Sequence, residues 1–282
     1  MDAPPFDTAA RDALRRSYAL GRTAIRAAQS DPRFSYALYV PPAFTAATRI
    51  VVCVHGSTRD SFLDFRDGFA EFGRWNDCII LCPLFPINVR GDGNANGYKY
   101  MQEGEIRYDL LLLSMVEEVR GRYGLTAGAF AIFGYSGGGH FSHRFAILHP
   151  GRLWACSIGA PGSVTLLDPG RDWWVGIRDL HHRFGMAFDA AALARVPVQM
   201  IVGDADLETW EITHKPGGTY WMEGANDAGR TRPDRLDALR HSFEAVGVTV
   251  RFDLLPGVSH DRMKVVGRVQ DFFASVLRTM RG

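Results

Sequence analysis

The sequence predicts an α/β protein with a mostly parallel central sheet. Short, continuous apolar segments that end in glycine or proline alternate with longer segments that carry apolar residues at helical spacing. Strands that are apolar on both faces are typical of sheets covered by helices on both sides. The composition is that of a globular protein with a large core: 46% of residues are hydrophobic, 22% are charged, and the formal net charge is +1.

Seven segments are expected to be strands. The first, residues 34–42 (FSYALYVPP), alternates between apolar and polar residues and is expected at an antiparallel edge of the sheet. The other six are nearly uninterrupted apolar runs, at residues 49–56, 78–86, 129–137, 153–161, 196–204 and 248–257. Helices are expected between or after them, at residues 105–122, 139–148, 233–246 and 263–280.

The whole chain, residues 1–282, is expected to form one domain, because no repeat or low-complexity linker divides it. An N-terminal extension, about residues 1–32, has arginines and apolar residues at helical spacing, which predicts helix. We expect it to pack against the domain or against a second subunit, so a homo-oligomer is one alternative. Two long connections, about residues 162–195 and 207–232, are expected to form a small cap or lid.

Aromatic residues are frequent in these two cap segments. The first contains Trp173 and Trp174, and the second contains Trp210 and Trp221. Such residues either line a substrate pocket or pack the insertion onto the core, and the sequence leaves both alternatives open.

Charge and hydropathy argue against several classes of partner and location. With a net charge of +1 and no long run of one sign, neither nucleic acid nor an anionic membrane is expected as a partner. No segment approaches the roughly 18 apolar residues of a membrane span, and the N-terminus lacks the apolar run of a signal peptide. The four cysteines have no metal-type spacing. They are expected to be buried free thiols in a reducing, cytoplasmic location.

The stretch GYSGGGH, residues 134–140, predicts a nucleophilic serine. Ser136 lies between Gly134 and Gly138, which gives the GxSxG pattern of a sharp strand-to-helix turn that exposes a serine hydroxyl. An expected strand precedes the motif and an expected helix follows it, as the motif requires. The alternative is a glycine-rich turn that contains a serine by chance.

Other chemically capable residues follow other strands. The residues His55, Gly56 and Ser57 end one strand, an aspartate pair follows another, and His260 follows the last. Because the carboxyl ends of parallel strands meet at one edge of a sheet, we expect these residues to form one site. Such a site contains the parts needed for acyl transfer.

These motifs, in this order, resemble the α/β-hydrolase superfamily. The matching stretches are VCVHGS (52–57), GYSGGG (134–139), GDAD (203–206) and GVSHD (257–261), so the resemblance covers about residue 49 to the C-terminus. The HGS loop and the stretch GYSGGGHFSHRFAILHP are similar to the branch that contains esterases of the polyhydroxyalkanoate-depolymerase and feruloyl-esterase type. The resemblance implies the α/β-hydrolase fold, with helices on both faces of the sheet.

The resemblance also implies roles for individual residues. Ser136 is expected to be the nucleophile and His260 the base, with oxyanion donors at the backbone amides of Ser57 and Gly137. Asp206 matches the expected position of the acid, with Asp204 and Glu208 as alternatives in the same loop. Among the other histidines, His55 is expected to brace the oxyanion loop, and His140, His143 and His149 are expected to pack. His181 and His182 lie in the expected cap and His241 in an expected helix.

The expected activity is hydrolysis of a carboxylic ester, acting on a small-molecule ester or acyl substrate through an acyl-enzyme. An amidase or peptidase and an acyltransferase are the alternatives among enzymes, and a binding protein without turnover is the alternative outside them. No cofactor motif occurs, so no cofactor is expected.

Two further features have competing interpretations. Residues 92–103, DGNANGYKYMQE, match the calcium-loop expression of EF-hands. No helix is expected before them and Lys99 occupies a position that is normally apolar, so a polar loop without metal is favoured. Arg59 and Arg90 lie near strand ends and could bind a carboxylate, but surface positions are favoured for both.

Overall fold

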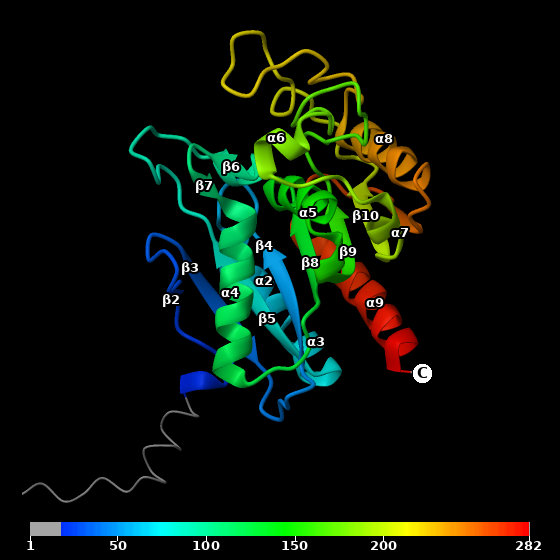
Figure 1. The fold of residues 1–282 in the computed structure, drawn as a ribbon. Coiled ribbons are helices and arrows are strands. Elements are labelled where there is room, and N and C mark those ends of the chain that lie inside the picture. The colour runs from blue at the N-terminus through cyan, green and yellow to red at the C-terminus, as the bar shows by residue number, and fades with distance from the viewer. Residues whose placement is uncertain (1–17, 282) are drawn as a thin grey trace, which may run out of the picture.

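The computed structural model describes residues 18–281, which are built around one nine-stranded sheet (Figure 1). Its long strands lie in the spatial order β3-β5-β4-β8-β9-β10-β11 and all are parallel except β3, which pairs antiparallel with β5. The bounds are β3 Ser35–Val40, β4 Arg49–Val54, β5 Cys78–Leu84, β8 Phe130–Tyr135, β9 Leu153–Gly159, β10 Val198–Gly203 and β11 Val250–Leu255. The predicted fold class is confirmed.

The central strands are buried on both faces. Every residue of β8, β9 and β10 is buried, as their continuous apolar sequences predict. Strand β11 differs, because its residues are only partly buried or exposed. It pairs with β10 alone among the described strands, so one of its edges has no strand beside it.

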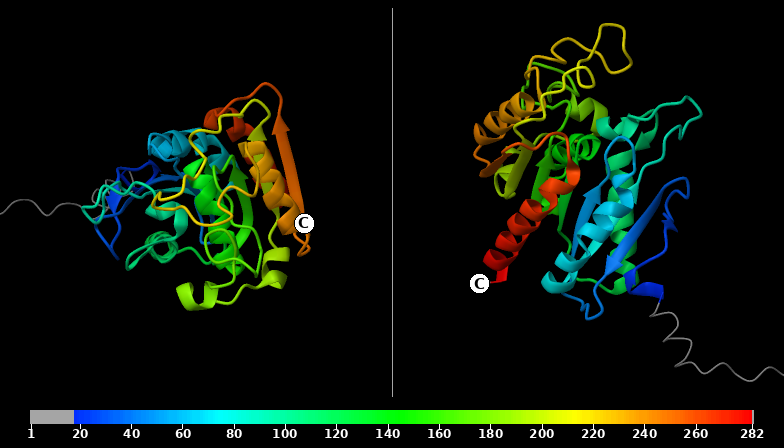
Figure 2. Two further views of the ribbon diagram at one scale, coloured as in Figure 1. Left: turned by 90° about the horizontal axis from the view of Figure 1, so that it is seen from above. Right: turned by 180° about the vertical axis from the view of Figure 1, so that it is seen from behind.

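Helices cover both faces of the sheet, as predicted. The helices α2 (Ser61–Gly68), α3 (Ala70–Asn76) and α9 (Arg262–Arg281) pack together on one face, as the view from behind shows (Figure 2). On the other face lie α4 (Tyr108–Tyr123) and α5 (Gly137–Leu148), while α8 (Arg232–Glu244) packs on β10 and β11.

The helix expected from residue 105 begins three residues later. The preceding residues form a small antiparallel hairpin of β6 (Gln102–Glu103) and β7 (Ile106–Arg107). Inside this hairpin the Glu103 carboxylate is buried and accepts a hydrogen bond from the Tyr108 hydroxyl at 2.6 Å. A buried carboxylate requires such a partner, which favours the hairpin over an earlier helix start.

The expectation of a helical N-terminal extension is wrong for residues 21–27. They form two short strands, β1 (Gly21–Arg22) and β2 (Arg26–Ala27), both antiparallel to β3. Strand β3 would otherwise expose a row of unpaired backbone groups at the sheet edge. These residues satisfy that edge, for example through a hydrogen bond of 2.9 Å from the Thr23 amide to the Leu38 carbonyl. The part of the prediction on residues 1–17 falls outside the described residues.

The two expected cap segments lie above the carboxyl ends of the parallel strands (Figure 1). The first contains only two short helices, α6 (Leu180–Phe184) and α7 (Ala190–Ala194). Its tryptophans, Trp173 and Trp174, are buried, and their indole nitrogens donate at 3.0 Å to the carbonyls of Tyr100 and Tyr220, respectively. Trp173 therefore links the first segment to the loop that contains Tyr100, and Trp174 links it to the second cap segment.

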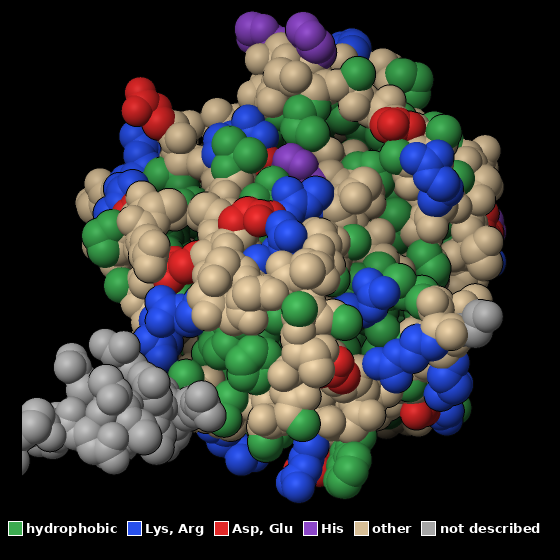
Figure 3. Space-filling view, turned by 60° about the horizontal axis from the view of Figure 1, so that its bottom comes forward, with side chains coloured by type: hydrophobic (Ala, Val, Ile, Leu, Met, Phe, Trp, Pro, Cys, Tyr) green, Lys and Arg blue, Asp and Glu red, His purple; other side chains and the backbone are tan. Residues whose placement is uncertain are grey.

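The four cysteines are buried and free. On the face shown in Figure 3, basic side chains are interspersed with acidic ones. Within residues 18–281, no helix has the length and apolar character needed to cross a bilayer.

Candidate active site

Ser136 occupies the sharp turn between β8 and α5. Its backbone angles are φ 56° and ψ −116°, a conformation that is rare for residues other than glycine. A Cβ on Gly134 would overlap the backbone of Gly138, and one on Gly138 would overlap the Val54 carbonyl. The two glycines of the GxSxG motif are therefore required by close backbone packing under the serine.

Ser136 lines a cavity of about 690 Å³ at the carboxyl ends of the strands. Gly56, Ser57 and His260 line the same cavity, together with residues from the second cap segment. The sequence-predicted residues thus come from the ends of β4, β8 and β11 and meet at one opening. Its volume suits a small-molecule ligand.

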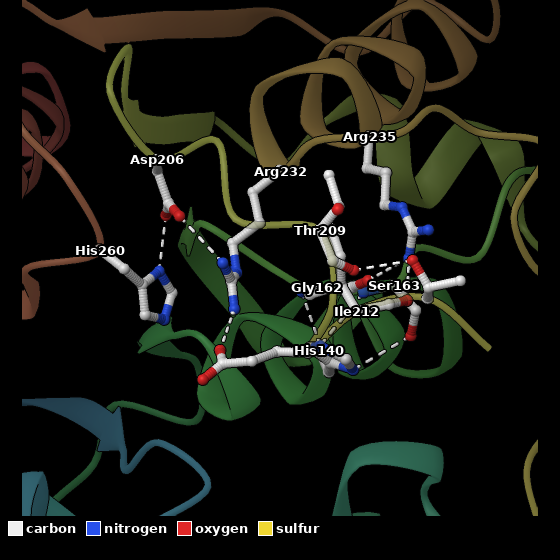
Figure 4. A network of polar contacts seen from close by, with 11 residues as sticks. His140, Gly162, Ser163, Asp206, Thr209, Ile212, Arg232, Arg235 and His260 are labelled. Carbon is white, nitrogen blue, oxygen red and sulfur yellow. Dashed lines mark hydrogen bonds and ion pairs between the residues drawn. The ribbon is translucent and has the colours of Figure 1, made fainter. Parts of the chain in front are cut away.

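His260 belongs to a chain of polar contacts that continues into the protein (Figure 4). Its Nδ1 lies 2.5 Å from Oδ2 of Asp206, which is buried. Arg232 Nη1 donates to the other oxygen of Asp206 at 2.9 Å, and its Nη2 donates to Glu211 at 2.7 Å. Both oxygens of Asp206 are therefore bonded, and the carboxylate is fixed in orientation with one oxygen toward the imidazole.

Asp204 and Glu208, the alternative acids, do not lie in this chain of contacts. Asp204 accepts a hydrogen bond from the Gly257 amide at 2.7 Å, which links the β10 and β11 turns. It is exposed, as is Glu208. In this structure the contact with His260 is made by Asp206.

The loop after β4 lies directly against the elbow. A Cβ on Gly137 would come within 2.9 Å of the Ser57 amide nitrogen, so the amide-bearing segments of both loops are adjacent. His55 holds the loop: its Nδ1 donates to the Gly56 carbonyl at 2.8 Å and its Nε2 accepts from the Phe85 amide at 3.0 Å. Burial lowers the pKa of His55 to about 3, so it stays neutral in this role.

Two histidines of α5 hold the start of the first cap segment. His140 Nε2 accepts from the amides of Gly162 at 2.7 Å and Ser163 at 3.2 Å (Figure 4). His143 Nε2 accepts from the Thr165 amide at 3.0 Å. Burial lowers the pKa of both imidazoles well below the usual value, as acceptor nitrogens require. Both side chains thus serve chain packing, although His140 also borders the cavity.

Comparison with solved structures identifies this architecture. The poly(3-hydroxybutyrate) depolymerase of Bordetella parapertussis superposes with a TM-score of 0.73 at 21% identity, over 97% of this chain and 99% of its own. The poly(aspartic acid) hydrolase-1 of Sphingomonas sp. KT-1 gives 0.69 at 21% identity, over 84% and 92% of the two chains. A ferulic acid esterase gives 0.60 at 16% identity, over 90% and 97%. The chain has the α/β-hydrolase fold. No protein-family model and no curated protein matches the sequence.

Within this α/β-hydrolase fold, sequence reasoning missed the environment of two arginines. Arg59, expected at the surface, is only partly exposed, and its guanidinium donates to three carbonyls, those of Ser57, Phe85 and Ala95. Arg232 was not singled out, because 26 residues separate it from Asp206 and no local motif marks it. Arg90 is exposed, as expected, and lies 3.9 Å from Asp92.

The residues of the calcium-loop motif form a loop and a 3-10 helix rather than a loop between two α-helices. The Glu103 carboxylate is buried against Tyr108, and residues 97–100 form the 3-10 helix η1 (Gly97–Tyr100). Within the described residues, no group of three or more potential histidine, cysteine or carboxylate ligands converges.

We therefore expect calcium to be dispensable. Treatment with EGTA should leave the melting temperature and any hydrolytic activity unchanged, because the last residue of the motif is already engaged by Tyr108. Thermal unfolding with EGTA and with added calcium checks this. A fall in melting temperature that calcium restores would contradict it.

Proposed function

We propose that this chain is a serine hydrolase that cleaves a carboxylic ester through an acyl-enzyme. One observation carries the proposal: Ser136, on a strained turn, lines the same cavity as His260, and the His260 imidazole is hydrogen-bonded to the buried carboxylate of Asp206. A nucleophile, a base and an orienting acid are the three parts of such a site. The esterases and hydrolases among the structural neighbours support the same reaction class.

In the proposed first step, His260 Nε2 takes the proton of Ser136 while Oγ attacks the carbonyl carbon of the ester. Asp206 accepts from Nδ1–H, which fixes the tautomer that leaves Nε2 free, and it stabilises the imidazolium. Arg232 holds the second oxygen of Asp206 at 2.9 Å and so keeps the carboxylate from rotating away. His260 then protonates the departing alkoxide.

The negative charge that develops on the ester oxygen needs donors placed in advance. We propose the backbone amides of Ser57 and Gly137, which the packing of the two loops brings together. Gly137 is also the first residue of α5, where the amides of a helix N-terminus favour negative charge. His260 next activates a water molecule, which releases the acid and restores Ser136.

Amide hydrolysis and acyl transfer would use the same residues, and substrate panels separate them from ester hydrolysis. The test compares 4-nitrophenyl esters of increasing acyl length with the corresponding anilides, with and without an alcohol acceptor. We expect turnover of esters, with water as the main acceptor. Cleavage of anilides at comparable rates would favour an amidase, and failure to cleave any ester or bind a fluorophosphonate would favour a binding protein.

The structure separates the four cap tryptophans into three groups with different expected effects. Trp221 lines the cavity and is 43% exposed, whereas Trp173 and Trp174 are buried in the core of the cap. Trp210 is 72% exposed and does not line the cavity.

We therefore expect Trp221→Ala to change relative rates across the ester panel, because it removes part of the cavity wall. Trp174→Ala should instead lower stability by about 3–5 kcal/mol, the usual cost of truncating a buried aromatic side chain. Kinetics across acyl lengths and urea unfolding of both variants provide the check, with Trp210→Ala as the exposed control. Equal specificity changes in all three variants would contradict this division.

A further inference from the structure

Four cations in or near the cavity wall have no carboxylate partner within residues 18–281. The guanidiniums of Arg59, Arg144 and Arg235 donate only to carbonyl, hydroxyl and amide oxygens. The fourth is Lys99, whose ammonium group makes no hydrogen bond or ion pair within residues 18–281. Neutral oxygens satisfy the donors of the three arginines but leave their positive charge uncompensated.

Two of these arginines are deeply buried. Burial lowers the pKa of Arg144 and of Arg235 to about 10 in each case, so both stay charged at neutral pH. Arg144 also lies over the rings of Tyr100 and Trp174, at 4.7 and 5.2 Å from their centroids. Charges in a protein interior are poorly screened, and Arg144, which donates to the Lys99 carbonyl, adds positive potential around Lys99.

Lys99 differs from the three arginines because it lines the cavity and is partly exposed. It follows Tyr98 in η1, and the Tyr98 hydroxyl lies next to the positions of Gly137 and Ser57. Burial first, and then Arg59, Arg144 and Arg232, lower the pKa of Lys99 to about 8, which leaves most of it protonated at neutral pH. Glu211 is the nearby acid, and its carboxylate is already engaged by Arg232 at 2.7 Å.

The other cations of the cavity wall are either neutralised or screened. Arg232 is bonded to two carboxylates, and Arg262 lies 3.2 Å from Asp60 and 3.0 Å from Asp64. Lys215 is exposed at the rim, where water screens its charge. Among the described residues, Lys99 is thus the cavity cation that is partly buried and has no ion pair.

The remaining lining residues are mostly polar or aromatic. Ile212 is the one aliphatic side chain among the described residues that line the cavity. The aromatic rings of Tyr100, Tyr220 and Trp221 add apolar surface, so polar and apolar groups share the wall. A substrate that has both a polar and an apolar part fits such a wall.

We propose that Lys99 binds an anionic group of the substrate, such as a carboxylate. The natural substrate is then an ester that carries a negative charge close to the bond that is cleaved. This inference rests on the proposed function. An anion there would pair with the ammonium group of Lys99 and would also be favoured by the buried cations beneath it.

The test uses pairs of esters that differ in one charge. On the acyl side, 4-nitrophenyl hydrogen adipate is compared with 4-nitrophenyl 6-methylheptanoate, whose isopropyl group replaces the carboxylate. On the alcohol side, 4-acetoxybenzoate is compared with its methyl ester. For each pair, the ratio of kcat/KM for the anionic over the neutral ester is measured in the wild type, in Lys99→Met and in Lys264→Met. Lys264 is exposed on α9 and does not line the cavity, so it controls for loss of one positive charge.

For at least one pair, the ratio should fall by about 10- to 100-fold in Lys99→Met, the loss expected for one charge-assisted hydrogen bond. In Lys264→Met the ratios should stay within about 3-fold of the wild type, as for an exposed charge. Ratios that do not change in Lys99→Met, or that fall equally in both variants, would overturn the anion site. The hydrolase proposal would still stand if turnover depended on Ser136.

If no ester of either kind is cleaved, the proposed function fails and the anion site is tested by binding alone. Calorimetric titration with adipate should then show binding to the wild type that is weakened about 10- to 100-fold in Lys99→Met. Absence of binding to the wild type, or equal binding to both proteins, would overturn the inference.

Discussion

Replacing Ser136 by alanine is expected to abolish ester hydrolysis and labelling by a fluorophosphonate probe, with a loss in kcat on the order of 10⁶. The substitution removes the proposed nucleophile, and among the described residues that line the cavity Ser136 is the one non-glycine residue with a positive φ. Since alanine is smaller than serine and has the same Cβ, the elbow should still form. We expect the melting temperature to change little.

Labelling and mass spectrometry check this expectation directly. In the wild type the probe should modify the peptide that contains Ser136, and in Ser136→Ala it should modify none. Ser30→Ala, at an exposed turn before β3, is the matched control and should keep both activity and labelling. Wild-type labelling at a different serine would contradict the proposal.

The second large effect is expected at the acid. Asp206→Asn keeps the shape of the side chain but removes its charge. The asparagine NH2 group can donate to His260 Nδ1, which favours the wrong tautomer of the imidazole. Turnover should fall by orders of magnitude, up to about 10⁴. Because Asp206 is also a buried partner of Arg232, some stability should be lost as well, by about 3–5 kcal/mol if the pair is broken. Activity is therefore measured well below the melting temperature, with the folded fraction determined by circular dichroism.

Asp204→Asn is the matched control, two residues away in the same loop. The asparagine oxygen can still accept the hydrogen bond that the Gly257 amide donates at 2.7 Å, so its effect on stability should be at most about 1 kcal/mol and turnover should persist. If Asp204→Asn lost turnover while Asp206→Asn kept it, the role of the acid would pass to Asp204.

The sequence determined the central strands and the elbow because both depend on short-range patterns. Continuous apolar runs mark β4, β5, β8, β9 and β10, since a strand buried on both faces has to be apolar at every position. The elbow is equally local: the glycines at 134 and 138 follow from backbone contacts within one turn and with the adjacent β4.

The edges of the sheet were decided by tertiary structure. Residues 21–27 have a helical pattern of arginines and apolar residues, yet the open edge of β3 pairs with them as strands. Pairing with β3 outweighs a weak helix propensity in this segment, because the backbone NH and CO groups at the edge of β3 would otherwise lack hydrogen-bond partners in the sheet. The sequence prediction did not include α2 and α3, although Phe62, Phe65, Phe69 and Phe72 recur there at helical spacing and are buried.

In the candidate site, the sequence by itself determined which residues follow which strand, and so that Ser136, His260 and an aspartate would share one edge of the sheet. It left the choice between Asp204 and Asp206 open and did not indicate Arg232 or the lack of a partner at Lys99. Those features depend on contacts between residues far apart, such as Asp206 and His260, which are separated by 54 positions. Such contacts are set by the paths of loops, which have no periodic pattern, and only the packed structure decides which charges meet and which stay uncompensated.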